Sequence, residues 1–285
     1  MIEYIIMAIL QGLFEWLPIS STGQTFIVSM NIFGITPEEA YSLAIWLHLG
    51  TTLAVLMKFR TDFFKIFKSV LPKKYMVNEI DIKKRNWLIY ATLGTGITAI
   101  PLYIVFRIII SEGFTAFQGD LITLIISGLL IITGVVILKS KKIYGKNSIE
   151  EISKNLIPKD SFLSGLIQGV SILPGVSRSG VTVSTILLEK YNQDNALKLS
   201  FLMSVPVALA SIIVDIMVNF IFGTGSFFGS LNIILIIITT SISFLVGYLT
   251  IDFLLRIAKK INFGYFCITY GIIAYLIILP FMIIA

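Results

Sequence analysis

The sequence consists of long hydrophobic stretches separated by short polar segments. Several of these stretches contain no charged residue over the roughly 20 residues that a helix needs to cross the hydrocarbon core of a bilayer. The pattern predicts six transmembrane helices, near residues 39–58, 87–107, 120–139, 197–219, 231–253 and 263–283. We therefore expect an all-α integral membrane protein.

Two further apolar stretches, residues 1–35 and 161–190, are interrupted by proline, serine and glycine. The interruptions fall at residues 18–23 and 174–180, and each half on either side is too short to cross a bilayer. The economical interpretation is a helical hairpin that dips into the membrane and returns to the same face. We expect two such re-entrant hairpins beside the six crossings.

The two interrupted stretches repeat each other at an offset of 157 residues. Ser20 then corresponds to Ser177, Gly23 to Gly180, and Gln11 to Gln168. The single membrane domain, residues 1–285, divides into repeats at about 1–140 and 158–285, each with one hairpin and three crossings. An odd number of crossings inverts the second copy, so the sequence predicts an inverted-topology repeat whose interrupted helices meet near the middle of the membrane.

Composition and charge support a membrane protein and indicate its orientation. Hydrophobic residues make up 56% of the chain, charged residues 13%, and the mean hydropathy is +0.93. Lysine and arginine concentrate in residues 58–85, 139–160 and 256–260, which the positive-inside rule places in the cytoplasm. This predicts a multi-pass protein of the cell membrane with both termini outside. The net charge of +6 lies in these loops, and no nucleic-acid-binding module is visible.

The interruptions place polar groups at membrane depth, where irregular backbone must be buried in protein or line a cavity. A half-helix begins after each interruption, so its free N–H groups and the positive end of its dipole point into that cavity. Hydroxyl side chains at the two helix starts add further donors: Ser20, Ser21, Thr22, Ser177 and Ser179. Two such helix ends that face each other form an anion site. The competing interpretation is that these small residues serve only helix packing.

Two charged side chains narrow the anion to phosphate. Arg178 is costly inside a membrane unless it is paired, and its planar guanidinium matches phosphate oxygens. Glu15 would repel a bound phosphate unless a divalent cation bridges the two or the carboxyl holds a proton, which makes it a candidate metal ligand or general base. The alternative is that the two residues are only counter-ions of each other.

Two other polar residues are weaker candidates. His48, the only histidine, lies inside the predicted crossing 39–58, where a polar contact between helices is favoured over catalysis. Gln11 lies one helical turn before Glu15 on the same face, and we expect it to form a structural hydrogen bond in the hairpin.

The segment QGLFEWLPISSTG, residues 11–23, resembles the first signature of the undecaprenyl pyrophosphate phosphatases, also called the bacitracin-resistance phosphatases. PGVSRSG at 174–180 is similar to their second signature, and FLMSVP at 201–206 to a third familiar stretch. The resemblance covers the whole chain. It implies a fold with six spans, two re-entrant hairpins and a site open to the outer face. The implied activity is the metal-dependent hydrolysis of undecaprenyl pyrophosphate to undecaprenyl phosphate and inorganic phosphate, which recycles the carrier lipid of the cell wall.

The resemblance also assigns roles to residues. It places the acidic metal or base position on Glu15, with Mg²⁺ or Ca²⁺ as the cation, and the arginine that grips phosphate on Arg178. The attacking oxygen is then either Ser21, activated by Glu15, or a water. The other signature residues are expected to bind the substrate: Ser20, Thr22, Gly23, Gln24, Ser177, Ser179 and Gly180.

The sequence departs from the family pattern at two positions. The first residue of the first signature is often glutamate, and here it is Gln11. The histidine that ends this signature, which has been assigned a role as nucleophile or proton carrier, is Gln24 here. Because a glutamine does not exchange a proton near neutral pH, a mechanism of that kind requires His48 as the substitute.

Two alternatives to hydrolysis stay open at this point. An inverted repeat with an anion site is also a transporter architecture, and such a protein would carry undecaprenyl phosphate across the bilayer. A binding protein would hold the pyrophosphate lipid without cleaving it. In each case the expected partners are a polyprenyl pyrophosphate lipid and the membrane, and a homodimer is a further expectation.

Overall fold

The computed structural model describes residues 1–17, 19–71, 78–111, 116–140, 145–222, 231–260 and 263–284. Within these ranges the chain is built from helices, and the one strand-like feature is an isolated bridge between Asn147 and Tyr191. The predicted all-α class is therefore confirmed. Pro18 of the first interruption lies outside the described residues, as do these parts of the predicted loops: 72–77, 112–115, 141–144 and 223–230.

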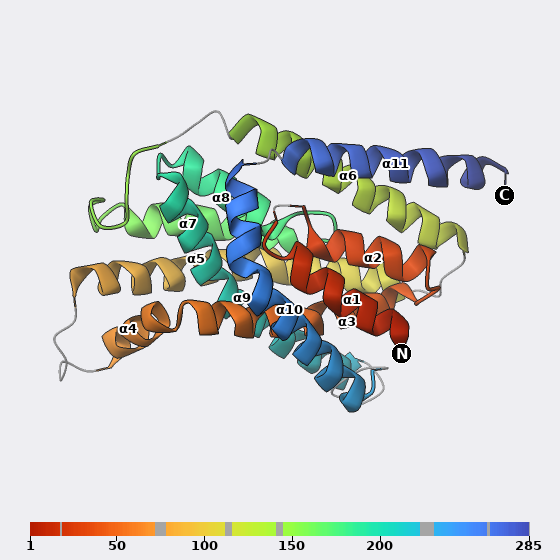
Figure 1. The fold of residues 1–285 in the computed structure, drawn as a ribbon, viewed down its shortest axis with the longest axis horizontal. Helices are drawn as coiled ribbons and strands as arrows, with labels where there is room; N and C mark the ends of the chain where they lie inside the picture. Colours follow the sequence, from red (N-terminus) through yellow and green to blue (C-terminus); the bar gives the residue numbers. More distant parts are fainter. Residues whose placement is uncertain are drawn as a thin grey trace.

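The helices follow the predicted order along the chain (Figure 1). They are α1 (Ile2–Phe14), α2 (Ser21–Asn31), α3 (Pro37–Lys58), α4 (Arg60–Val70), α5 (Glu79–Ser111), α6 (Ala116–Ser140), α7 (Ile157–Gly169), the 3₁₀ turn η1 (Val170–Ile172), α8 (Arg178–Leu188), α9 (Gln193–Phe222), α10 (Ile233–Lys260) and α11 (Phe263–Ile284). The pairs α1/α2 and α7/α8 fall on the two predicted hairpins. Helices α3, α5, α6, α9, α10 and α11 fall on the predicted crossings.

Four helices are long and apolar enough to cross a membrane, judged by length and composition. They are Pro37–Lys58, Glu79–Phe106, Gln193–Val218 and Ile233–Phe253. The described apolar parts of α6 and α11, Thr123–Lys139 and Cys267–Leu276, are shorter. These lengths are those of a helical membrane protein.

Both interruptions restart a helix in the same way. Ser20 precedes α2 and its hydroxyl accepts a hydrogen bond from the Gly23 N–H at 3.2 Å; Ser177 precedes α8 and accepts from the Gly180 N–H at 3.1 Å. Serine is favoured at this position because its oxygen satisfies an N–H group that has no partner within the helix. Ser20 adopts a left-handed backbone with φ of 58°, which is uncommon for a residue other than glycine.

Glycines bring each hairpin against a crossing of the other half of the chain. Helix α1 packs on α10, and a Cβ added at Gly12 would lie 2.9 Å from the Val246 Cβ. Helix α7 packs on α5, and a Cβ added at Gly169 would lie 1.8 Å from the Thr98 Oγ1. Gly12 and Gly169 are equivalent positions of the sequence repeat, so both hairpins use the same close approach.

The remaining helices complete the bundle. Helix α3 packs against α9 and α10, and α6 pairs with α11 along one edge of the molecule (Figure 1). An aromatic cluster of Phe26, Tyr41 and Phe106 joins α2, α3 and α5 in the largest apolar core. This core holds the start of α2 against α3, which positions the first interruption.

A cluster of charged residues joins α4 to two crossings at the basic end of the bundle. The Asp62 carboxylate accepts a hydrogen bond from the Lys84 Nζ of α5 at 2.7 Å and lies 3.0 Å from the Lys198 Nζ of α9. Burial raises the pKa of Asp62, but the hydrogen bonds and charges of the two lysines outweigh it, and the net pKa is lowered. The carboxylate therefore stays ionised and ties the three helices together.

Candidate functional site

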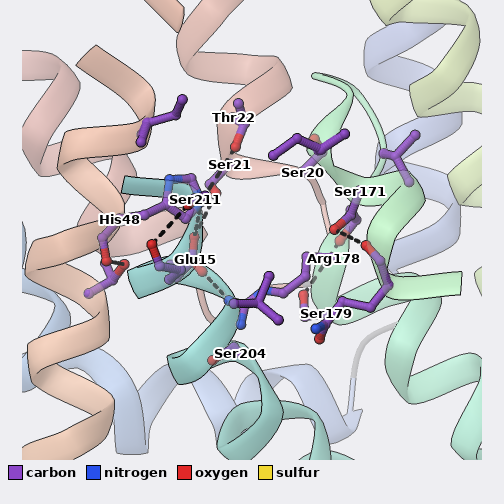
Figure 2. A pocket seen from close by; sticks show the side chains of 18 of the residues that line it. Glu15, Ser20, Ser21, Thr22, His48, Ser171, Arg178, Ser179, Ser204 and Ser211 are labelled. Atoms are coloured by element: carbon purple, nitrogen blue, oxygen red, sulfur yellow. Dashed lines mark hydrogen bonds and ion pairs between the residues drawn. The ribbon is translucent and has the colours of Figure 1, made fainter. Parts of the chain in front are cut away.

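The two interruptions meet at a cavity of about 90 Å³ in the middle of the bundle. The walls come from the starts of α2 and α8, the middle of α3, η1, and facing segments of α5 and α9. Figure 2 shows Ser20, Ser21 and Thr22 of the first interruption and Arg178 and Ser179 of the second around this cavity. We refer to it below as the chamber.

The interruptions are in direct contact. A Cβ added at Gly23 would lie 2.7 Å from the backbone N and Cα of Gly175. The Ser179 hydroxyl donates to the Leu17 carbonyl at 3.3 Å. Gly175 itself has φ of 97°, in the region that glycine adopts most readily. The sequence repeat thus identified two segments that lie together in space although they are far apart along the chain.

Glu15 is the centre of the polar contacts in the chamber. Its carboxylate is 5% exposed. The Gln11 Nε2 and the Ser21 Oγ each donate to the Glu15 Oε2 at 2.8 Å. The Arg178 guanidinium donates to the other oxygen, Oε1, and forms an ion pair with it. A buried carboxylate requires such donors because its charge has left water.

Arg178 carries the contact from one hairpin to the other. It is the first residue of α8, and its side chain is 18% exposed. The pairing with Glu15, which the sequence offered as the alternative to a phosphate role, is present, and it occurs in a cavity lined by hydroxyl groups and two helix starts. A guanidinium in this position has further N–H donors for a ligand in the chamber.

His48 lines the chamber and also makes the expected polar contact between helices. Its Nε2 is 3.4 Å from the Glu15 Oε2 and 3.5 Å from the Thr22 Oγ1. Its Nδ1 is 2.6 Å from the Ala44 carbonyl oxygen, one turn earlier in α3. Because a carbonyl only accepts, this contact assigns the hydrogen to Nδ1 and leaves Nε2 facing the carboxylate. The sequence favoured a structural role because it did not reveal that α3 turns His48 toward the first interruption.

Gln24 is turned away from the chamber. It is 2% exposed, and its Nε2 donates to the Ile19 carbonyl at 2.7 Å. Gly23 and Gly180, also predicted to bind substrate, do not line the chamber, and their N–H groups serve the two serine caps. Ser177 lines the chamber while it caps α8.

Several residues of the chamber were missed by sequence reasoning. On α9, Ser204 and Ser211 line the chamber together with Val207 and Ala208. Their spacing of three, four and seven residues places them on one face of a helix, a signal that could have identified them. Thr95 of α5 also lines the chamber and accepts a hydrogen bond from the Gln168 Nε2 at 3.1 Å.

Among the described residues, no group of three His, Cys, Asp or Glu side chains could hold a metal ion. The chamber offers a cation the single carboxylate of Glu15, which already accepts hydrogen bonds from Gln11, Ser21 and Arg178. This donor set does not fit a divalent ion held by protein ligands alone, since such ions take several oxygen ligands.

Comparison with known proteins identifies relatives over almost the whole chain. A family model described as "Bacitracin resistance protein BacA" matches residues 4–276. A protein of Methanothrix thermoacetophila named undecaprenyl-diphosphatase is 39% identical over 273 residues, which cover 95% of this chain and 94% of the relative. A relative of the same name from Methanococcoides burtonii is 36% identical, over 96% of this chain and 97% of its own length. Another from Haloarcula marismortui is 32% identical, over 94% of this chain and 93% of its own length.

Proposed function

The chain belongs to the BacA family of bacitracin resistance proteins, and we propose from this that it hydrolyses undecaprenyl pyrophosphate to undecaprenyl phosphate and inorganic phosphate. The observation that carries the proposal is the Arg178–Glu15 pair at the meeting point of two helix starts. A pyrophosphate needs positive charge and N–H donors, and its cleavage needs an oxygen nucleophile with a base beside it. The chamber contains each of these groups.

For the arrangement in the membrane, we propose six crossings and two re-entrant hairpins that enter from opposite faces. The equivalent serine caps and the equivalent glycine contacts of α1 and α7 support an inverted repeat. The basic segments lie in the cytoplasm in this arrangement, and the chamber opens to the outer face of the cell membrane. The reaction would then return the carrier lipid of the cell wall to its monophosphate form.

The pyrophosphate binds between the first N–H groups of α2 and α8. Ser20 and Ser177 already satisfy the third N–H of each helix, so the first two N–H groups are the ones available to a ligand. The substrate phosphates compete with Glu15 for the Arg178 guanidinium. When Arg178 turns to the phosphate, Glu15 loses its ion-pair partner and becomes a better proton acceptor.

Ser21 is the preferred nucleophile. Its Oγ donates to the Glu15 Oε2 at 2.8 Å, so Glu15 can take the hydroxyl proton as Oγ attacks the terminal phosphorus. The bond between that phosphorus and the bridging oxygen then breaks, and undecaprenyl phosphate leaves as the anion. Water hydrolyses the phosphoserine and regenerates Ser21. The alternative is direct attack by a water that Glu15 orients.

His48 is the proton carrier in this proposal, in place of Gln24. Its Nε2 faces the oxygen of Glu15 that receives the Ser21 proton, at 3.4 Å. The Nδ1 contact with the Ala44 carbonyl fixes the ring in this orientation. Gln24, whose amide donates to the Ile19 carbonyl, then has a structural role.

A Mg²⁺ or Ca²⁺ ion would enter with the substrate. Because the donor set offers one carboxylate, most of its ligands would be phosphate oxygens and water, with Glu15 as the protein ligand. Such an ion neutralises charge on the phosphates when it is bound. A homodimer stays a prediction.

Phosphate release from undecaprenyl pyrophosphate by the purified protein in detergent tests the proposal. We expect turnover in the wild type and a loss of about 10²-fold or more in Glu15→Ala and in Arg178→Ala. Turnover that both substitutions leave unchanged would remove this site from the reaction. In liposomes, movement of the lipid phosphate between leaflets without phosphate release would indicate a transporter instead.

A further inference from the structure

An open apolar groove of about 490 Å³ lies on the outer surface of the bundle, where α5, α9 and α4 meet. Almost none of its lining is polar. Its walls are formed by Leu88, Ile89, Thr92 and Leu93 of α5, Val205, Pro206 and Leu209 of α9, and Phe63 of α4.

The groove and the chamber are formed by the same two helices. On α5, Leu88 and Thr92 line the groove and Thr95 and Ala99 line the chamber. These four residues follow one another at intervals of three or four, so they form one continuous stripe on the face of the helix. Along this stripe, the polar chamber and the apolar groove are neighbouring parts of a single wall.

Helix α9 also lines both spaces, with the chamber on one face and the groove on the neighbouring face at the same level of the helix. Ser204, Val207 and Ala208 line the chamber, while Val205 and Leu209, each adjacent in sequence to a chamber residue, line the groove.

We propose that the polyprenyl chain of the substrate leaves the chamber between α5 and α9 and lies in this groove. The inference rests on the proposed function, which places the pyrophosphate between α2 and α8. The chamber, at about 90 Å³, has no room for a long isoprenoid chain. The chain must therefore leave it, and the groove is the apolar surface that continues the chamber wall.

The position of the groove also assigns the direction of the lipid. Along α5, Leu88 precedes Thr95 by seven residues, so this wall of the groove extends about 10 Å further than the chamber toward the end of the bundle that carries α4, while on α9 the two spaces lie at the same level. That end carries the ion cluster of Asp62, Lys84 and Lys198 and is the predicted cytoplasmic end. A lipid bound in this way has its phosphates toward the outside and its tail toward the cytoplasm, the orientation of a lipid of the outer leaflet.

The test narrows the groove and compares substrates with long and short tails. Thr92→Trp and Leu209→Trp each place an indole in the groove from opposite walls, and neither residue touches the chamber. Ile97→Trp is the matched control, because Ile97 is on the same helix as Thr92, is 60% exposed and lies outside the groove. Phosphate release is measured with undecaprenyl pyrophosphate and with dimethylallyl pyrophosphate, whose single isoprene unit is too short to fill the groove.

We expect the KM for undecaprenyl pyrophosphate to rise about tenfold or more in both groove variants, and the KM for dimethylallyl pyrophosphate to stay within about twofold. The Ile97→Trp control should match the wild type with both substrates. An unchanged KM for the long substrate in both groove variants overturns the proposal. An equal rise for the two substrates also overturns it, since the substitutions would then act on the chamber.

A separate binding measurement distinguishes failure of the groove from failure of the proposed function. If the wild type releases phosphate from neither substrate, the hydrolase assignment is wrong. The affinity for undecaprenyl monophosphate in detergent still tests the groove in that case. Binding about tenfold weaker in Thr92→Trp and Leu209→Trp than in Ile97→Trp supports it, and equal binding in all three variants refutes it.

Discussion

The buried ion pair between Glu15 and Arg178 leads to a prediction about substrate affinity. In the absence of phosphate, the Glu15 carboxylate accepts from the Arg178 guanidinium at the bottom of the chamber. A phosphate that binds Arg178 must displace this carboxylate and then sit beside it. Glu15→Gln removes the negative charge but keeps an oxygen that can still accept from Arg178. We therefore expect this variant to bind the phosphate group more tightly while it loses turnover.

The magnitude follows from the geometry of the pair. A phosphate that shares the guanidinium with Glu15 would lie about 5 Å from the carboxylate, and two unit charges at that separation repel by about 3 kcal/mol at an effective dielectric constant of about 20. Part of this gain is lost because one oxygen of the carboxylate becomes an NH2 group, which competes with the Gln11 and Ser21 donors around it. We expect a net improvement in Kd of about 10- to 100-fold.

Isothermal titration calorimetry with a non-hydrolysable bisphosphonate analogue of the substrate measures this effect in detergent. Arg178→Gln is the complementary variant, and its affinity should fall, because it removes the group that holds the phosphate and leaves Glu15 unpaired. The kcat of both variants should fall by about 10²-fold or more. Unchanged or weaker analogue binding in Glu15→Gln would refute the idea that Glu15 and the phosphate compete for one guanidinium.

Three further predictions concern the proton carrier, the contact of the two interruptions and the charged cluster on α4. His48→Gln should lower kcat by about 10²-fold while Gln24→His changes it less than about twofold, since only His48 faces Glu15; a large gain in Gln24→His would contradict this. Gly23→Ala should destabilise the protein by about 1–3 kcal/mol, seen as a lower Tm in detergent, because its Cβ would lie 2.7 Å from the backbone of the second interruption; an unchanged Tm would show that the interruptions can separate. Because the pKa of Asp62 is lowered in the folded state, its stabilising effect is present above the ordinary carboxyl pKa and is lost as the pH falls through the lowered value. Between pH 7 and pH 3, the Tm of the wild type should therefore fall further than the Tm of Asp62→Asn. Equal falls in Tm would show that the ion pairs of Asp62 do not stabilise the fold.

Much of the architecture could be predicted because the bilayer restricts what a sequence can form. Apolar stretches of spanning length indicate helices, since every backbone polar group in the hydrocarbon must be satisfied within its own segment. Four helices of spanning length, α3, α5, α9 and α10, fall on four of the six predicted crossings. The two interruptions were visible because proline, serine and glycine rarely occur together in an apolar helix. The repeat of Ser20 in Ser177 predicted that both would restart a helix in the same way, and both do.

The composition of the chamber was harder to predict, because it depends on which faces of distant helices turn toward it. His48 and Ser211 are separated from Glu15 along the chain and belong to crossings that the sequence treats as ordinary apolar helices. The rotation of α3 and α9 about their own axes decides that these side chains point inward, and packing against α10 and α5 sets that rotation. Gln24 is the opposite case. Its position in the first signature suggested that it binds substrate, but its side-chain amide donates to the nearby Ile19 carbonyl instead.

The sequence by itself determined the helical membrane class, the two interruptions and their internal equivalence, since these follow from local hydropathy, chain stiffness and the preferences of serine and glycine. Only the tertiary structure decided that Arg178 reaches Glu15, that His48 joins them and that α5 and α9 line both the chamber and an apolar groove. The physical reason is that these relations are contacts between segments far apart in the chain, and their geometry is fixed by the packing of whole helices rather than by any local pattern.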